Sequence, residues 1–323
     1  MKPIDGFKVV VVGTGSLGGS MIKHISKLGA EVIGVNRKGN NVEGCSKIIT
    51  FDKIDEVLPS ADFLYLAVPE TEETDLIKAA KLINAAKNPL IVWGQGVILG
   101  EAEEEFRAFV EKSGVPAAWT ILGGSAIETS HPLNVGMVGM HGNYAPNLLT
   151  NQCDLFLAIG MRFDDRVTGD LSTYAKQAKI IHFEIDPAEI NKNIEVDIAV
   201  LGDAKQTLSK ITPLITKKSH KNWLDKFKKL YEIEYNKVIH NELNPSKKGL
   251  TMGEVIKEIN LQTNGDAAIV SDVGQHQMVA CRYATFNKSK SNITSGGLLS
   301  LIHISEPTRP RLISYAVICL KKK

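Results

Sequence analysis

Short apolar runs alternate with longer amphipathic stretches along most of the chain. The runs are rich in β-branched residues and end at glycine, proline or charged positions, which is typical of strands buried on both faces of a parallel sheet. They predict strands at residues 8–12, 31–35, 61–68, 89–93, 154–159, 179–184, 197–201 and 267–271. Helical spacing of apolar residues predicts helices at residues 16–28, 74–86, 101–112, 251–259 and 275–285. The apolar side of the first helix is expected to consist of Leu17, Met21, Ile25 and Leu28.

This alternation of strands and helices predicts an α/β fold in which parallel sheets are flanked by helices on both faces. A polar stretch at residues 241–249 is typical of an interdomain linker. Before it, Trp223, Phe227 and Leu230 share one side of a helix, where we expect them to pack and not to form a site. The chain then divides into a first α/β segment at 1–75, a central domain at 76–218, a helix and linker at 219–249, the start of another α/β domain at 250–298 and a tail at 299–323.

Composition and charge narrow the class of protein. The chain has 323 residues, of which 43% are hydrophobic and 23% are charged, as in globular proteins. The net charge of +2 implies no basic surface for nucleic acid. The N-terminus lacks the apolar core of a signal peptide, and the apolar runs are too short to span a membrane. The four cysteines form no C-x-x-C pair, which argues against a zinc site or a disulfide framework and favours a cytoplasmic location.

A glycine-rich turn follows the first predicted strand. Gly13, Gly15 and Gly18 form a G-x-G-x-x-G pattern that opens a helix, and a helix N-terminus can hold a pyrophosphate. Arg37 follows the second strand, where an acidic residue usually binds the ribose of NAD. A guanidinium there favours NADP through its 2′-phosphate. Two alternatives stay open: the turn is tight but binds no ligand, or Arg37 is only a solvated loop residue.

Three segments extend this motif within residues 6–75: VVGTGSLGGS, VIGVNRKG and ADFLYLAVPETEET. In order and spacing they resemble the nucleotide-binding domain of D-2-hydroxyacid dehydrogenases. The resemblance implies binding of NAD or NADP. It stops near Asp75, before the positions of the family's catalytic Arg, Glu and His, so it implies no working dehydrogenase.

Glycines and charged residues also stand at the ends of the strands predicted between residues 76 and 218. The carboxyl ends of parallel strands are the usual ligand edge of an α/β sheet, where glycines let the backbone approach a phosphate and carboxylates suit ribose hydroxyls. This pattern suits a dinucleotide site. Its candidate residues are Gly94, Gly96, Gly139, Met140, His141, Gly142, Gly160, Arg162, Glu184, Asp186, Gly202 and Asp203. Taken alone, His141 is more often an ordinary loop histidine, and Asp165 and Arg166 suit a surface ion pair.

Long segments follow one another between residues 76 and 298: AAKLINAAKNPLIVWGQGVILG, HPLNVGMVGMHGNYAPNLL, CDLFLAIGMRFDDRVTG, IIHFEIDPAEINKNIEVDIAVLGDAK and SDVGQHQMVACRYATF. They resemble the acetolactate synthase large subunit, a thiamine diphosphate enzyme. The resemblance implies a transferase that joins two pyruvates, or pyruvate and 2-oxobutanoate, in branched-chain amino acid synthesis. The implied cofactors are thiamine diphosphate, magnesium and FAD. The implied partners are 2-ketoacid substrates, further copies of the chain and a regulatory small subunit.

The same resemblance implies roles for single residues. The candidate residues of the central segment become FAD contacts, with FAD serving structure and not redox chemistry. Arg162 would recognise the carboxylate of the second ketoacid, which suits a guanidinium. Gln275 and His276 would lie nearest to thiamine diphosphate. The family's activating Glu and its magnesium motif lie outside the matching segments, so no metal ligand is assigned and we expect this chain to be inactive.

The tail at residues 299–323, LSLIHISEPTRPRLISYAVICLKKK, does not continue this resemblance. It resembles translated sequencing-adapter DNA, which predicts a non-native tail on a chimera of two gene fragments. A divergent natural tail is the alternative. Two other functions also stay open: an NAD(P)-binding dehydrogenase fragment, and a non-catalytic module that binds FAD or another nucleotide.

Overall fold

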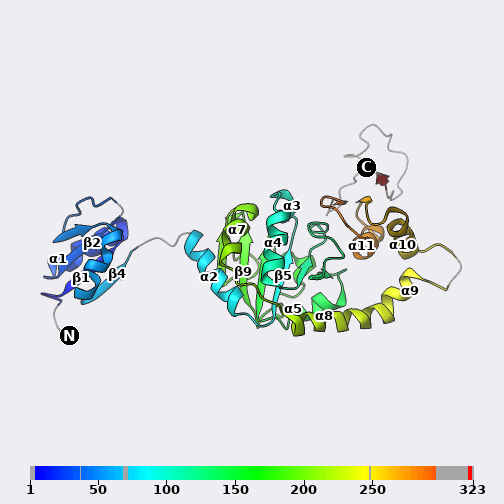
Figure 1. Cartoon of the computed structure of the whole chain (residues 1–323), viewed down its shortest axis with the longest axis horizontal. Coiled ribbons are helices and arrows are strands. Elements are labelled where there is room, and N and C mark those ends of the chain that lie inside the picture. The colour runs from blue at the N-terminus through cyan, green and yellow to red at the C-terminus, as the bar shows by residue number, and fades with distance from the viewer. Residues whose placement is uncertain (1–3, 37, 68–71, 247–248, 296–318, 322–323) are drawn as a thin grey trace. The chain divides into compact units, whose positions relative to one another are not determined.

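The computed structural model describes residues 4–36, 38–67, 72–246, 249–295 and 319–321. The chain divides into two compact units, Met1–Thr71 and Glu72–Lys323. Both are built on parallel sheets flanked by helices (Figure 1), which confirms the predicted α/β class. Among the helices of the described ranges, none is long and apolar enough to cross a membrane.

The first unit is a four-stranded parallel sheet with the strand order β3-β2-β1-β4. Valines of β1 alternate between its faces: Val10 and Val12 pack with one core cluster, and Val9 and Val11 pack with another that includes Ile22 of the first helix. The β-branched run that predicted the strand thus fills both faces. The elements are β1 (Lys8–Val12), α1 (Ser16–Lys27), β2 (Glu31–Val35), β3 (Lys47–Ile49), η1 (Phe51–Glu56), η2 (Leu58–Ser60) and β4 (Phe63–Leu66).

The apolar side predicted for α1 is partly wrong. Ile22 and Ile25 are buried, whereas Leu28 is the C-cap residue and 62% exposed. The helix ends there because Gly29 adopts a φ of +87° and turns the chain away. The side chain of Leu17 lies outside the described part. Strand β4 is shorter than the predicted 61–68, since it ends at Leu66, and residues 68–71 also lie outside the described ranges.

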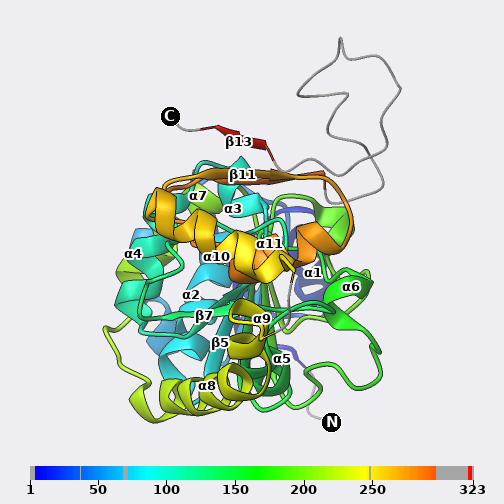
Figure 2. The same cartoon turned by 90° about the vertical axis from the view of Figure 1, so that its right-hand side faces the viewer.

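The second unit contains a six-stranded parallel sheet with the order β10-β9-β8-β5-β6-β7. Its strands are β5 (Pro89–Trp93), β6 (Ala117–Trp119), β7 (Asn134–Met137), β8 (Leu155–Ile159), β9 (Lys179–Glu184) and β10 (Ile198–Leu201). Alternate residues of β5 enter two core clusters on opposite faces. One face is covered by α2 (Glu72–Ala85), α4 (Glu103–Ser113) and α7 (Ala204–Ile211), and the other by α5 (Tyr144–Thr150) and α8 (Lys221–Glu234). Helices α5 and α8 lie side by side (Figures 1 and 2).

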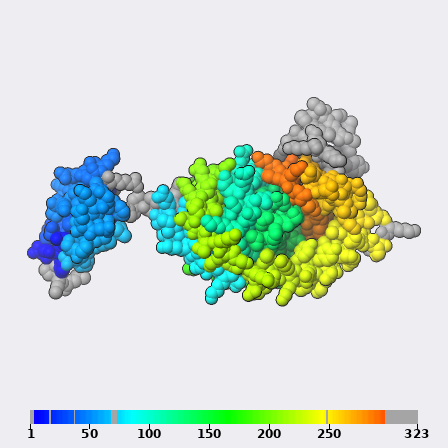
Figure 3. All heavy atoms as spheres, in the orientation of Figure 1, coloured from blue at the N-terminus to red at the C-terminus, as the bar shows by residue number. Residues whose placement is uncertain are grey.

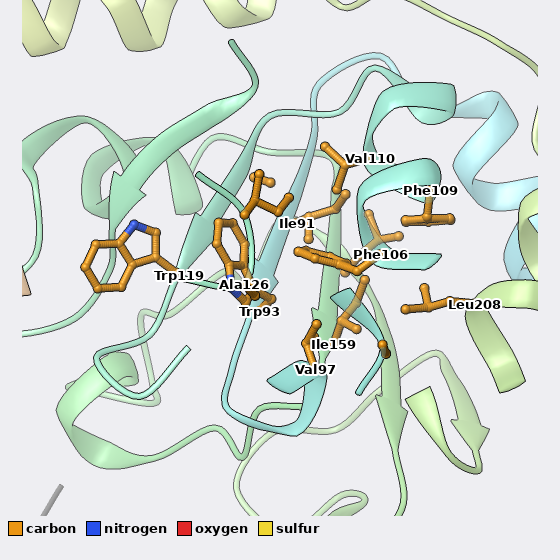
Figure 4. Close-up of a cluster of buried hydrophobic side chains, with 14 of the residues drawn as sticks. Ile91, Trp93, Val97, Phe106, Phe109, Val110, Trp119, Ala126, Ile159 and Leu208 are labelled. Atoms are coloured by element: carbon orange, nitrogen blue, oxygen red, sulfur yellow. The ribbon is translucent and has the colours of Figure 1, made fainter. Parts of the chain in front are cut away.

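Aromatic side chains fill the larger core cluster (Figure 4). Trp93 of β5 lies against Phe106 of α4 with ring centroids 5.2 Å apart, and its Nε1 donates to the carbonyl oxygen of Gly123 at 2.7 Å. Both side chains are fully buried. Because a buried indole N–H is costly without an acceptor, this hydrogen bond fixes the position of Trp93. On the other face Trp223 and Phe227 are also buried, which confirms their predicted packing role.

The chain beyond α8 forms a second βα region. The predicted linker at 241–249 begins as helix, because α8 continues through the π-helical turn η5 (Tyr235–Ile239) into α9 (His240–Leu243). The helix ends at Leu243 with Asn244 as its C-cap residue, since Pro245 disfavours helical backbone before it. The remaining elements are α10 (Met252–Thr263), β11 (Ala268–Ser271), α11 (Gln275–Tyr283) and β12 (Asn292–Thr294). In Figure 3 this region, yellow to orange, lies against the central helices and strands, and Ile256, Ala280 and Cys281 enter their core.

Only a small part of the predicted non-native tail falls within the described residues. Cys319–Lys321 forms β13, which pairs antiparallel with β11. Residues 299–318 and 322–323 lie outside the described ranges. The origin of the tail stays a prediction.

Candidate nucleotide-binding site

A cleft with a volume of about 660 Å³ opens at the carboxyl ends of the central strands. Its volume falls within the range of roughly 300–1,000 Å³ that is common for cofactor sites. We call it the central cleft. It is lined by the turns that follow β5, β6, β8, β9 and β10. Among the candidate dinucleotide residues, those in its lining are Gly94, Gly96, Gly160, Arg162, Glu184, Gly202 and Asp203.

Two glycine turns meet in the middle of this cleft. The chain leaves β5 toward β6 on one side and reaches β8 on the other, so the strand order reverses between β5 and β8. The Gly96 amide donates to the Gly160 carbonyl at 2.9 Å, and a Cβ on Gly96 would lie 2.6 Å from the Cα of Gly160. Gly160 has a φ of +57°. These glycines are therefore needed for the backbone approach between the turns, which leaves the crevice above them open.

The cleft carries charge of both signs. Glu184 is 9% exposed, and its Oε1 accepts from the backbone amides of Ile185 at 2.9 Å and Asp186 at 3.3 Å. Arg162 is largely exposed and lies 3.0 Å from Asp164, measured from Nη2 to Oδ2. Burial opposes ionisation of Asp164, but the Arg166 amide and the nearby guanidiniums leave its pKa below the ordinary value. A buried carboxylate and an exposed cation together suit a ligand with hydroxyls and an anionic group.

His182 was not among the predicted site residues, although it supports the cleft. It is fully buried on β9, and its Nε2 lies 2.9 Å from the Met161 carbonyl oxygen in the turn after β8. Burial lowers the pKa of His182, so the neutral ring donates this hydrogen bond through Nε2. Its Nδ1 is buried without a hydrogen-bond partner. The available signal was one polar residue inside an otherwise apolar strand.

The loop of Gly139, Met140, His141 and Gly142 lies outside the lining of the cleft but is tied to it. The Met140 amide donates to the carbonyl oxygen of Arg166 at 2.8 Å, and Arg166 is a lining residue. A Cβ on Gly142 would lie 2.4 Å from the Met137 carbonyl oxygen, so this glycine is explained by the protein's own packing.

Asp186 is also outside the lining. It caps the 3₁₀ turn η3 (Pro187–Glu189), where its Oδ1 accepts from the Ala188 amide at 2.9 Å. Its neighbour Ile185 lines the cleft instead. The carboxylate expected at this strand end is therefore supplied by Glu184.

The predicted thiamine residues stand at a different strand end. Gln275 and His276 begin α11 directly after the turn that follows β11. Gln275 is exposed, and His276 is partly buried. The His276 Nε2 and the Ser271 Oγ are buried without a hydrogen-bond partner. Two unsatisfied polar atoms at the carboxyl end of a strand suit a bound polar group, although neither residue lines the central cleft.

The glycine turn of the first unit has three different geometries. Gly13 has a φ of +90°, and its amide donates to the Val35 carbonyl at 2.9 Å. A Cβ on Gly18 would lie 1.8 Å from the Gly13 carbonyl oxygen, whereas a Cβ on Gly15 would meet nothing within 4 Å. Tight turn, open approach and close packing are the roles that these positions have in dinucleotide folds. Arg37 lies outside the described residues, so its role stays a prediction.

Comparison with protein families matches both units. Residues 76–211 match the central domain of thiamine pyrophosphate enzymes, and residues 1–102 match the NAD binding domain of D-isomer specific 2-hydroxyacid dehydrogenases. The matches overlap over 76–102. Because α2 and β5 pack in the core of the six-stranded sheet, the structure assigns the overlap to the second unit.

Curated relatives confirm the resemblance to acetolactate synthase. The acetolactate synthase large subunit of Buchnera aphidicola subsp. Schizaphis graminum is 40% identical over 228 residues, which is 68% of this chain and 38% of that protein. The probable acetolactate synthase large subunit of Methanococcus aeolicus is 38% identical over 68% of this chain and 39% of its own length. The acetolactate synthase large subunit of Corynebacterium glutamicum is 38% identical over 72% of this chain and 38% of its own length. This chain thus spans less than two fifths of the length of these relatives.

Proposed function

We propose that the second unit is the FAD-binding central part of an acetolactate synthase large subunit, followed by the start of its thiamine diphosphate domain. The proposal rests on one observation above all. The central cleft lies at the point where the strand order reverses, inside the segment that matches the central domain of thiamine pyrophosphate enzymes.

The residues of the cleft fit a flavin dinucleotide. Glu184, held by two backbone amides, can accept hydrogen bonds from ribose hydroxyls. Arg162 is exposed at the rim, where its guanidinium can reach a pyrophosphate or the carboxylate of a second 2-ketoacid. We assign to the flavin a role in holding the fold and not in redox chemistry.

The reaction proposed for the whole enzyme is the joining of pyruvate with pyruvate or 2-oxobutanoate. Thiamine diphosphate, held with magnesium, would supply the decarboxylation of the first ketoacid and its addition to the second. In this chain Gln275 and His276 would position the cofactor, supported by the unsatisfied Ser271 hydroxyl.

A second candidate function, binding of NAD or NADP, belongs to the first unit. The open space at Gly15, beside the tight turn of Gly13, favours it, because a pyrophosphate can approach the backbone there. We propose nucleotide binding and not dehydrogenase activity for this unit.

We further propose the partners and location that the relatives suggest. The relatives are large subunits by name, so association with further copies and with a small regulatory subunit is proposed for the whole protein. A reducing, cytoplasmic location is supported by Cys45, Cys153 and Cys281, which are all unpaired.

FAD titration of the full chain tests the proposal. We expect flavin fluorescence to change on binding and the melting temperature of the second unit to rise, because a ligand of the folded state stabilises it. Arg162→Ala and Glu184→Gln should each weaken binding about tenfold, the effect expected for one lost charge-assisted hydrogen bond.

Lys288→Ala is the matched control, since Lys288 forms an exposed ion pair with Asp266 outside the cleft. It should leave the FAD affinity unchanged. The proposal is wrong if FAD produces no change up to its solubility limit, or if both Arg162→Ala and Glu184→Gln bind it as the original chain does.

A further inference from the structure

A buried carboxylate joins three helices of the second unit. Glu234 at the end of α8 is 5% exposed. Its Oε2 accepts from the backbone amide of Tyr144, the first residue of α5, at 3.0 Å. Its Oε1 is paired with the guanidinium of Arg282 on α11. Helix α5 belongs to the central domain, whereas α11 begins with the predicted thiamine residues, so one side chain spans the two regions.

Helix α8, which carries Glu234, is anchored near its start and changes geometry directly after Glu234. Near the helix start, the Trp223 Nε1 donates to the Pro89 carbonyl oxygen at 2.8 Å, which anchors α8 to the first residue of β5. Immediately after Glu234 the helix widens into the π-helical turn Tyr235–Ile239. Such turns are rare and frequently found at functional sites. The buried charge is tolerable only with its partners in place, so loss of either would strongly disturb the arrangement.

From Tyr144 the contacts continue to the rim of the central cleft. In α5, the Asn147 side chain binds both the amide and the carbonyl of Gly139, each at 2.8 Å. The Met140 amide in turn donates to the carbonyl oxygen of Arg166, which lines the cleft. Arg282 itself is not a lining residue of the cleft. A continuous series of contacts therefore links α11 to the cleft through Glu234, α5 and the 139–142 loop.

We propose that Glu234 is a positioning residue that couples the start of the thiamine segment to the FAD cleft through its pairing with Arg282 and Tyr144. The coupling to FAD rests on the proposed function of the cleft. The link between α11 and the 139–142 loop is independent of that function, because it rests on the contacts of Glu234 and Asn147 alone. A ligand that binds at the Gln275–His276 turn should then change the affinity of the cleft for flavin. By linkage, flavin should change the affinity of the turn for that ligand by the same factor.

The test uses hydrogen exchange and FAD titration on the full chain. Arg282→Gln and Glu234→Gln should each accelerate amide exchange in residues 139–147 and weaken FAD binding, both about tenfold. The double variant should show little more than either single variant, because both remove the same link. Arg282→Lys keeps the charge and should restore part of both effects.

Two controls separate positioning from general loss of structure. Lys288→Gln breaks an exposed ion pair in the same βα region and should change neither readout. Exchange in β5 and β8 should stay unchanged in every variant, whereas a misfolded chain would exchange everywhere.

Each outcome bears on a different statement. If Arg282→Gln leaves exchange in residues 139–147 and FAD affinity at their original values, the coupling is absent and the proposal fails. If the original chain binds no FAD, the proposed function fails, while the exchange data still decide whether α11 controls the loop.

Discussion

The two parallel sheets of this chain differ in how far they are covered. In the central sheet β5 and β8 are buried along their whole length. In the first unit the edge strand β4 leaves Phe63, Leu64 and Leu66 between 49% and 63% exposed. The helix that follows β4 in the sequence is α2, and its Leu76 and Ile83 are buried in the core of the central sheet. A βα pattern in the sequence therefore predicts a parallel sheet, but it does not determine which sheet the helix will cover.

Paired substitutions of two phenylalanines give the largest expected difference between the sheets. Phe106→Ala removes a fully buried ring beside Trp93 and should lower the unfolding free energy of the second unit by about 3–5 kcal/mol. Phe63→Ala on β4 removes an exposed ring and should change stability by about 0.5 kcal/mol or less. Denaturant unfolding followed by circular dichroism measures the transitions of both units, and the fluorescence of the three tryptophans, which all lie in the second unit, identifies the transition that belongs to it. Equal effects of the two substitutions would contradict the difference in burial.

Glycine substitutions in the first unit give an intermediate effect. Gly18→Ala places a Cβ on the Gly13 carbonyl oxygen and should destabilise this unit by about 1–3 kcal/mol. Gly15→Ala finds open space and should leave stability nearly unchanged while weakening NADPH and NADH binding. Circular dichroism melting and nucleotide titration would measure the two effects. If Gly15→Ala binds both nucleotides as before, the turn is only structural.

Protonation of His182 gives the smallest effect and concerns the central sheet alone. Burial lowers the pKa of His182 in the folded protein, although Met161, Glu184 and Glu189 oppose that shift. The unfolded chain therefore binds a proton first as the pH falls. The stability of the second unit should decrease below pH of about 6.5, by at most about 1.4 kcal/mol per pH unit. His182→Gln should flatten this dependence in denaturant titrations between pH 5 and 8. An unchanged slope would assign the dependence to other groups.

Much of the fold could be predicted because most strands are marked by a short apolar run in the local sequence. The bounds of β1, β2, β5 and β9 agree with prediction to the residue, since each apolar run is bounded by charge, glycine or proline. Strand β6 was missed because it is only three residues long, Ala117–Trp119, and its two alanines have little strand preference, so its place depends on pairing with β5 and β7.

The candidate site was less predictable, because sequence cannot tell what a glycine approaches. We predicted ligand contacts at Gly94, Gly96 and Gly160. A Cβ built on Gly94 or Gly96 would instead lie closest to the turn of Gly160, and a Cβ on Gly160 closest to the turn of Gly96. Gly142 likewise meets the Met137 carbonyl. His182 was overlooked because a single polar residue in an apolar strand does not reveal that β9 places it behind the turn after β8. The positions that the structure does bring to the cleft lie at strand ends, where topology alone decides proximity.

The strand order of the central sheet also has a consequence for how the chain folds. Pro89 of β5 pairs with Leu155 of β8, so the strand at the centre of the sheet is completed by a partner made much later in synthesis. The other neighbour of β5 is β6, which follows it much sooner in the chain, so β8 is the late partner. Closing a longer loop costs more entropy before any contact repays it, so the pairing of β5 with β8 is intrinsically slow. Until β8 has been synthesised, the fully apolar strand Pro89–Trp93 lacks this partner and is prone to aggregate. Its protection during synthesis depends on α2 and α4 folding over it first.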